Sequence, residues 1–275
     1  REINILLAAI EKESEKYNLK LNYNKCEYVA MNGKAHIHFS NGKPMKMVDQ
    51  ATYLGGLITH DAGRWSELNN RISKALVTCN KLKTFWYKTN CSYKWKLQVY
   101  NAVIISQLTY GLSTLQMTPT MLGRLDAFQM RGLRYILKIE HSYYSRISNE
   151  EVYEKINIIL NKGTDIDISW QEFITANRFD KPKQIVKLSD YVMNQQNKLL
   201  GHVIRADPLD PMKQPTINNT LQIPGIYKRR VGRPRLGWVS ENCKWIYKKQ
   251  FHENYDEHNP EHVQKLIKEA KDRKF

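Results

Sequence analysis

The most suggestive chemical pattern in this sequence is an arginine-rich loop near the C-terminus. Residues 228–238 read Lys-Arg-Arg-Val-Gly-Arg-Pro-Arg-Leu-Gly-Trp. Guanidinium groups bind phosphate oxygens through paired hydrogen bonds, while the glycine permits close approach and the proline limits the freedom of the unbound loop. Trp238 and Trp245 would add flat surfaces on which unpaired bases stack. The loop predicts contact with RNA or DNA; the alternative is a solvated basic face with core tryptophans.

Residues that could hold a metal ion or attack a substrate are sparse. Asp165 and Asp167 have the spacing of a metal-binding Asp-x-Asp, a pattern that arises easily by chance. His36 and His38 share one face of an expected strand without an evident third ligand, which favours an exposed hairpin face. The sequence contains no P-loop, Gly-x-Ser-x-Gly or His-Glu-x-x-His motif. We therefore expect no metal site and no cofactor.

Composition and charge narrow the class of protein. With 43 Lys and Arg against 27 Asp and Glu, the net charge is +16, which attracts polyanions over about a Debye length. Nucleic acid is favoured over a membrane surface, because no basic amphipathic helix with a wholly apolar reverse face stands out. The chain is 41% hydrophobic and has no membrane-spanning run. Its four cysteines form no Cys-x-x-Cys pair, which favours reduced intracellular thiols.

Hydrophobic periodicity predicts an α+β first half. Residues 2–17 have the spacing of an amphipathic helix, and Leu19–Leu21 alternate like a strand. Residues 35–48 are expected to form a hairpin with a type I′ turn at Asn41-Gly42, since both central residues of that turn need positive φ. Residues 53–58 resemble a further strand with a bend marked by glycine.

Helices are expected to follow this small sheet. Apolar residues from Trp65 to Trp86 recur at alternating spacings of three and four, which predicts one long helix with both tryptophans in the core. A second helix is expected at about 92–109, and a third begins at Thr118-Pro119 with threonine as its cap. Later helices are expected at 150–160, at 189–203 with Ser189 as the cap, and from Asn259 onward, with a proline-punctuated extended connector from 207.

Positive charge gathers in two segments. Residues 71–140 carry eleven Lys and Arg against Asp126 and Glu140, and residues 221–250 carry eight against Glu241. Asp126 is expected to pair with one of the nearby cations. The residues predicted to bind RNA are Arg71, Lys74, Lys81, Lys83, Lys88, Lys94, Lys96, Arg124, Arg131, Arg134, Lys228, Arg229, Arg230, Arg233, Arg235 and Trp238.

Four blocks of sequence, in order, carry a family resemblance. Residues 17–27 (YNLKLNYNKCE) resemble a palm motif written G-L-x-L-N-x-x-K-T, with Asn18 in place of glycine and Cys26 in place of threonine. Residues 51–58 are similar to the strand-turn F-K-Y-L-G-x-x-I. The other matches are Tyr110-Gly111 with Leu133–Leu137, and Leu199–Arg205 with Arg230–Trp238. Together these blocks resemble the reverse transcriptase of non-LTR (LINE-like) retrotransposons, over about residues 1–245.

The resemblance implies a division of the chain. It would comprise a small antiparallel sheet from the end of the palm, a helical thumb bundle and a mostly helical C-terminal extension. The helix at residues 2–17 would follow the catalytic strand. The implied parts are a palm-like segment 1–60, a thumb-like domain 61–140, a helical extension 141–206, an extended connector 207–227, and a basic loop with C-terminal helix at 228–275.

The resembled enzymes transfer nucleotides with two metal ions, held by one upstream aspartate and an Asp-Asp pair. This sequence contains no two adjacent aspartates. Lys25 matches the palm lysine, thought to protonate the leaving pyrophosphate, but a general acid without metals drives no reaction. We therefore expect a catalytically inactive, reverse-transcriptase-derived protein that recognises structured RNA by shape and phosphates. A structural subunit of a ribonucleoprotein, such as a mitochondrial ribosome, is the favoured setting.

Two other functions stay open at this point. The chain could be the C-terminal fragment of an active RNA-directed DNA polymerase, or a scaffold whose helices bind another protein. Because the first residue is Arg1, we expect either a processed N-terminus, as after removal of an organellar transit peptide, or a start within a longer protein. The expected partners are structured RNA, such as ribosomal RNA, and other proteins of the particle, with the nucleus as the alternative location.

Overall fold

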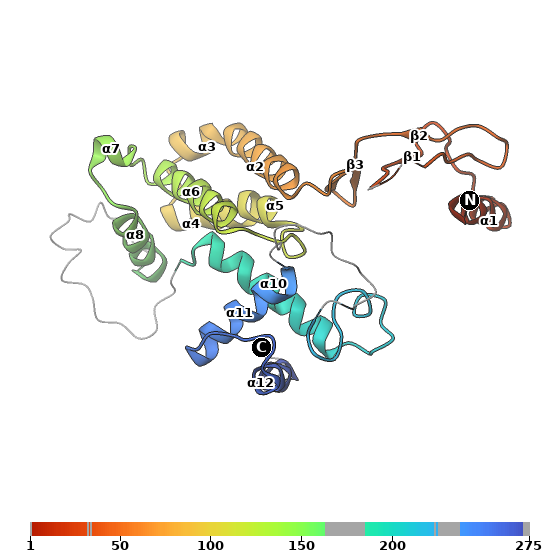
Figure 1. Cartoon of the computed structure of the whole chain (residues 1–275). Coiled ribbons are helices and arrows are strands. Elements are labelled where there is room, and N and C mark those ends of the chain that lie inside the picture. The colour runs from red at the N-terminus through yellow and green to blue at the C-terminus, as the bar shows by residue number, and fades with distance from the viewer. Residues whose placement is uncertain are drawn as a thin grey trace. The chain divides into compact units, whose positions relative to one another are not determined.

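The computed structural model describes residues 2–31, 33, 35–162, 185–222, 224 and 237–271 (Figure 1). The chain divides into two compact units, Arg1–Asn70 and Arg71–Phe275. Helices predominate, and the strands of the described residues all lie in the first unit, so the predicted α+β class is confirmed. No described helix combines the length and the apolar character needed to cross a membrane.

The first unit contains one helix, two pairs of short strands and the start of a second helix. Strands β1 (Glu27–Tyr28) and β2 (Lys46–Met47) pair in parallel, while β3 (Gln50–Tyr53) and β4 (Gly56–Thr59) pair antiparallel. The prediction of one antiparallel sheet was therefore wrong in part. The expected strand at Leu19–Leu21 does not form either. The helices are α1 (Glu2–Glu15) and the first part of α2 (Arg64–Lys81).

Both glycine-marked turns differ from what the sequence predicted: Asn41-Gly42 is not a type I′ turn, and residues 53–58 form the turn of a hairpin rather than one bent strand. At Asn41-Gly42, only Gly42 has positive φ, and the backbone N–H of Gly42 donates to the Phe39 carbonyl at 2.9 Å. This geometry is a type I turn followed by a left-handed glycine, so the predicted type I′ turn is wrong there. Both Leu54 (φ 47°) and Gly55 (φ 81°) have positive φ, and they form the two-residue connection between β3 and β4.

The first unit has a sparse apolar core. The side chains of α1 are held to the hairpin mainly by polar contacts: the Glu11 carboxylate accepts from the backbone N–H of Ser40 at 3.0 Å. The Ser40 hydroxyl also donates to this carboxylate, and that hydrogen bond is the main reason why the pKa of Glu11 is lowered. No residue of α1 is buried, and Leu6 remains 62% exposed. The apolar face that the periodicity predicted is thus present in α1 but uncovered.

The second unit begins with a helical bundle. The long helix predicted between Trp65 and Trp86 is broken near Leu82 into α2 and α3 (Lys83–Lys88). Trp86 is fully buried, as expected, but Trp65 is 38% exposed, so its predicted core position is wrong. The predicted helix at 92–109 is confirmed as α4 (Tyr93–Val99), a π-helical turn η1 (Tyr100–Ile105) and α5 (Ser106–Thr109).

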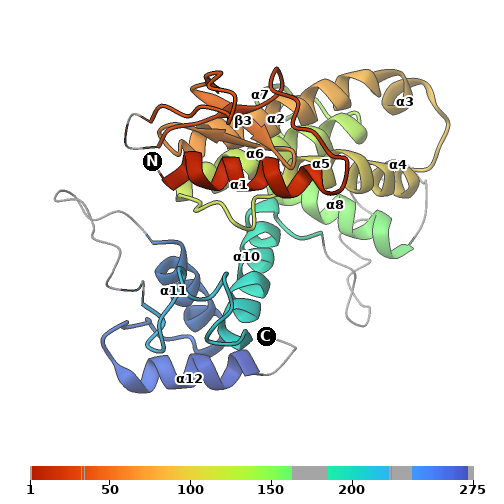
Figure 2. The same cartoon turned by 90° about the vertical axis from the view of Figure 1, so that its right-hand side faces the viewer.

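Helix α6 (Pro119–Ile136) organises this bundle. It begins where predicted: the Thr118 hydroxyl accepts from the backbone N–H of Met121 at 3.3 Å, and Pro119 occupies the first turn. Helix α6 packs against α3, α4, α8 (Asn149–Lys162) and α10 (Leu188–Arg205). Figures 1 and 2 show α10 running from α6 toward the C-terminal helices.

The start of α10 is capped from α6 rather than from its own sequence. The Asp126 carboxylate accepts from the backbone N–H of Ser189 at 2.8 Å, and the Gln129 amide oxygen accepts from that of Leu188 at 2.9 Å. The first N–H groups of a helix lack partners within it, so these side chains satisfy them. Ser189 is therefore not the cap that was predicted, and Asp126 acts as a cap where an ion pair was expected.

The C-terminal part has its own core, formed by α10, α11 (Trp238–Phe251) and α12 (Pro260–Lys271). Its buried members include Leu200 and Leu266, and Cys243, whose thiol pKa burial raises to about 12. Residues 207–222, predicted to be an extended connector, instead form successive turns that bury Ile217 and Leu221 in this core. The prolines thus mark turns in this segment. Residues 223 and 225–227 of the predicted connector lie outside the described residues.

Candidate nucleic-acid interface

A line of exposed cations follows α6. Arg124 and Arg131 are seven residues apart, nearly two full turns, so they share one face of the helix about 10 Å apart along its axis. Lys138 follows just beyond the helix end, where its backbone takes a left-handed conformation (φ 56°). The opposite face of α6 is buried through residues such as Leu125 and Leu133. We name Arg124, Arg131 and Lys138 the α6 basic ridge.

Other helices of the bundle also expose lysines. On α2, Lys74 and Lys81 are again seven residues apart, so they too share a helical face. Among the described residues, no carboxylate lies within ion-pair distance of these lysines or of the α6 basic ridge. Such cations can bind a phosphate without first breaking an internal ion pair. The exposed cations of this set are Lys74, Lys81, Lys83, Lys88, Lys94, Arg124, Arg131 and Lys138.

Three predicted RNA-binding residues of the bundle are buried inside the protein. The Lys96 ammonium donates to the carbonyls of Trp86 at 2.9 Å and Thr89 at 3.1 Å. The guanidinium carbon of Arg71 lies 4.9 Å from the ring centre of Tyr110. Because burial separates their charge from a polyanion at the surface, we leave Lys96 and Arg71 out of the RNA contact that we propose below. Arg134 is excluded for the same reason.

The buried Arg134 guanidinium fastens the segment that follows α6. Its Nη1 donates to the Glu140 carbonyl at 3.1 Å, while Nη2 donates to the Ile147 carbonyl at 2.7 Å and to Asn149 Oδ1 at 3.1 Å. The planar fork of arginine suits such convergent acceptors better than a lysine would. Arg134 thus holds the turn that contains the short helix α7 (Ser142–Ser145), and its role is structural.

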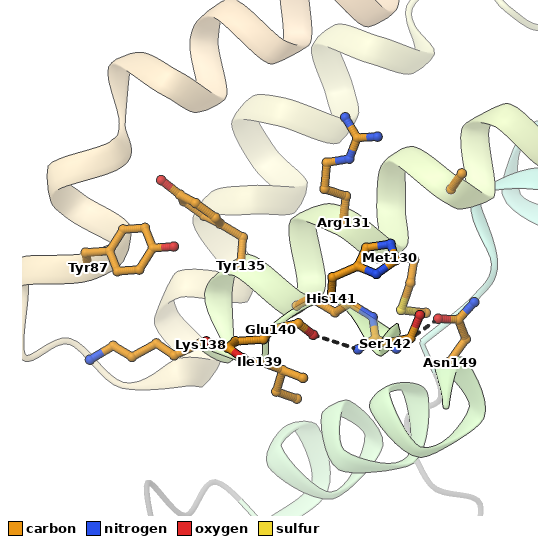
Figure 3. Close-up of a pocket in the computed structure, with 12 residues that line it drawn as sticks. Tyr87, Met130, Arg131, Tyr135, Lys138, Ile139, Glu140, His141, Ser142 and Asn149 are labelled. Atoms are coloured by element: carbon orange, nitrogen blue, oxygen red, sulfur yellow. Dashed lines mark hydrogen bonds between the residues drawn. The ribbon is translucent and has the colours of Figure 1, made fainter. Parts of the chain in front are cut away.

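A cavity opens beside the α6 basic ridge (Figure 3). It has a volume of about 600 Å³, and Arg131 and Lys138 of the ridge both line it. Figure 3 places Tyr87 and Lys138 at one side, with Ser142 and Asn149 at the other. The remaining lining residues are Ala127, Met130, Arg134, Tyr135, Ile139, Glu140 and His141. We name this cavity the α6 pocket.

Two tyrosines form the aromatic wall of the α6 pocket. The ring centres of Tyr87 and Tyr135 are 4.5 Å apart and their planes meet at 84°, the edge-to-face geometry that aromatic rings prefer. Burial, and then the charge that Tyr87 would carry, raise the pKa of Tyr135 to about 12. Its hydroxyl therefore stays protonated at neutral pH. Arg131 and Tyr135 are four residues apart, about one turn of α6, a signal in the sequence that the charge count alone overlooked.

Other predicted functional residues are placed elsewhere or lie outside the described residues. The indole N–H of Trp238 donates to the Ser113 carbonyl at 3.1 Å, so part of this side chain is used internally. Lys25 is exposed on a turn, where its backbone N–H donates to the Asn22 carbonyl at 2.9 Å. Outside the described residues lie Lys228, Arg229, Arg230, Arg233 and Arg235, and also Asp165 and Asp167.

Within the described ranges, no group of three or more His, Cys, Asp and Glu side chains could hold a metal ion. His36 and His38 are exposed, as expected for a hairpin face. No protein-family model, curated protein or solved structure matches this chain. The motif residues and the geometry of the α6 basic ridge and pocket are therefore the guides to its function.

Proposed function

We propose that this chain is an RNA-binding protein that contacts the phosphate backbone through the α6 basic ridge. The observation that carries the proposal is that Arg124 and Arg131 share one face of α6 and that Lys138, just beyond the helix, lines the same pocket as Arg131. All three are exposed and have no carboxylate partner in the described part of the chain. Phosphate contacts of this kind dominate affinity for nucleic acids. The exposed lysines of α2, α3 and α4 would extend the contact, and shape and phosphates would select structured RNA.

We further propose that the chain derives from a non-LTR retrotransposon reverse transcriptase. Two backbone features support the motif resemblance in physical terms. Asn18 stands where the palm motif has glycine, and its φ of 59° is a conformation that glycine and asparagine tolerate best. In the second motif, Gly55 also has positive φ, at the turn between β3 and β4.

The role that we propose for this protein is structural and not catalytic. The sequence lacks the adjacent aspartates on which the resembled enzymes hold their metal ions. A lone palm lysine, Lys25, supplies no catalysis without those ions. We propose that the protein is a subunit of a ribonucleoprotein, such as a mitochondrial ribosome, where it contacts structured RNA and neighbouring proteins. Its net charge of +16 suits that setting.

The ridge can be tested by its salt dependence. Replacing Arg124, Arg131 and Lys138 together with alanine is expected to weaken binding of a structured RNA at least about tenfold. It should also flatten the plot of log affinity against log salt by about two, since each phosphate contact contributes about 0.7–0.9 to that slope. Fluorescence anisotropy over a salt series from about 50 to about 300 mM measures both quantities.

A matched control removes the same charge elsewhere. Lys248, Lys268 and Lys271 are exposed lysines of α11 and α12, and their replacement with alanine lowers the net charge by the same amount. This control should retain most of the affinity and slope. If the two triple variants lost affinity equally, the protein would bind RNA only through its overall charge, and the α6 basic ridge would not be the contact.

One observation favours the alternative that the chain belongs to a larger, active polymerase. The apolar face of α1, including Ile5, Leu6 and Ile10, is exposed, and such a face is normally covered by further polypeptide. The coding sequence upstream of Arg1 distinguishes the two functions, because an in-frame palm with an Asp-Asp turn would favour the larger polymerase. In a primer-extension assay on an RNA template, nucleotide incorporation by the purified chain alone would contradict the non-catalytic proposal.

A further inference from the structure

We propose that the α6 pocket takes one unpaired nucleotide from the bound RNA, with its base against Tyr87 and Tyr135 and the phosphates on its two sides near Arg131 and Lys138. This inference rests on the proposed function and adds to it. The α6 basic ridge explains attraction to any phosphate backbone, whereas the pocket would select RNA that carries a bulged or looped base. Structured RNAs display such bases, and aromatic side chains are their usual platforms.

The dimensions and the aromatic wall of the pocket suit a nucleotide. A volume of about 600 Å³ lies in the range of sites that enclose small molecules, roughly 300–1,000 Å³. Tyr87 belongs to α3 and Tyr135 to α6, so the edge-to-face pair is fixed by the packing of these two helices. Tyr87 is 43% exposed, which leaves part of its surface open to an incoming base.

The charged residues that line the α6 pocket favour the binding of phosphate near Arg131 and Lys138. Arg131 and Lys138 line the pocket and lack carboxylate partners among the described residues, while Arg134, which also lines it, already donates through Nη1 and Nη2. The single carboxylate of the lining is Glu140. Three cations against one carboxylate leave the pocket positive. The Glu140 carboxylate would suit an amino group of a base or a ribose hydroxyl.

Hydrogen-bonding groups on the opposite side could read the edge of a base. His141 Nδ1 accepts from the backbone N–H of Tyr143 at 3.3 Å, so in the neutral ring Nε2 carries the proton and can donate. Asn149 accepts from Arg134 through Oδ1, which leaves its NH2 group for a ligand acceptor. The Ser142 hydroxyl can donate or accept. Together these groups match the mixed donors and acceptors of a nucleobase.

A second aromatic surface begins next to the pocket in the sequence. Tyr143 and Tyr144 follow the pocket residue Ser142, and both rings are largely exposed. Their centres are 5.2 Å apart, and the Arg146 guanidinium lies 5.4 Å from the ring centre of Tyr143. Exposed aromatic rings beside a cation are the combination that single-stranded nucleic acids stack upon. They would receive the bases that flank the captured nucleotide.

The test compares two RNA hairpins that differ by one bulged uridine. The full chain is expected to bind the bulged hairpin about tenfold more tightly than the fully paired one, as stacking of one base provides. Tyr87→Leu should remove this preference while leaving the affinity for the paired hairpin unchanged. The matched control, Tyr17→Leu, removes another exposed tyrosine and should retain the preference. Anisotropy with both RNAs at one salt concentration gives the ratio.

The outcomes separate this inference from the proposed function. Equal affinity of the unmodified chain for both hairpins, with the salt dependence retained, would overturn the nucleotide pocket and leave RNA binding standing. The absence of salt-dependent binding to either hairpin would overturn both. A 4-thiouridine at the bulge provides a direct check, because ultraviolet crosslinking should label peptides containing Tyr87, Tyr135 or His141. Crosslinks confined to other segments would place the base elsewhere.

Discussion

Arg134→Met is expected to lower the free energy of unfolding by about 4 kcal/mol, because it removes a buried guanidinium from several convergent acceptors. The carbonyls of Glu140 and Ile147 and the Asn149 side chain would each lose a charged donor, and the three acceptors would no longer be held together by one buried side chain. Methionine fills a similar length, so the loss reports hydrogen bonding more than volume. Urea unfolding followed by circular dichroism measures the change.

Arg131→Met is the matched control for this substitution, since Arg131 lies on the same helix but is exposed. It should change the unfolding free energy by no more than about 0.5 kcal/mol. The effects on a fully paired RNA hairpin, which does not use the pocket, should be reversed: folded Arg134→Met should keep its affinity for that hairpin, while Arg131→Met should lose part of it. Weakened RNA binding by a folded Arg134→Met protein would restore the sequence-based prediction that Arg134 contacts RNA.

Gly132→Ala is expected to destabilise the bundle by about 3 kcal/mol, at the upper end of overpacking effects. A Cβ atom at this position would collide with the Tyr100 hydroxyl oxygen and would lie 2.5 Å from the Cζ atom of the same ring. Tyr100 is itself buried in the π-helical turn η1, so its ring has little room to retreat. Thermal and urea unfolding of the purified variant measure the loss.

Gly123 offers an unusually close comparison, because it lies on the same helix and a Cβ atom added there would meet no other atom within 4 Å. Gly123→Ala should stabilise the protein by about 0.5–1 kcal/mol through helix propensity alone. Tyr100→Phe should partly rescue Gly132→Ala, since it removes the nearest atom but leaves the ring. Equal effects of the two glycine substitutions would show that Tyr100 can move away from α6, contrary to the close packing of α6 against η1.

Local signals in the sequence predicted individual elements well. The start of α6 followed from Thr118-Pro119, because capping depends on residues within one turn of each other. The burial of Trp86 followed from apolar spacing. Turn geometry was harder to predict: Asn41-Gly42 and Leu54-Gly55 each suggest a turn, and the flanking strands decide which one takes two residues of positive φ.

Features that depend on distant segments could not be predicted from the sequence. A count of charges does not distinguish Arg131, which is exposed, from Arg134, whose acceptors lie six to fifteen residues away. Lys96 was assigned to RNA for the same reason, although it donates to backbone carbonyls. The α6 pocket needed the packing of α3 against α6, which brings Tyr87 to Tyr135. Tertiary packing, which composition does not reveal, determines which lysine and arginine side chains are exposed and able to contact a phosphate.

Because α1 is held mainly by polar contacts, we expect the free energy of local opening to differ along the chain. With so little apolar area removed from water before residue 70, local opening of that segment costs much less free energy than global unfolding. Its amide protons should therefore exchange with deuterium long before those of α6 and α10, whose buried faces protect them. A protein built in this way can rearrange its N-terminal segment while α6 and α10 keep their structure.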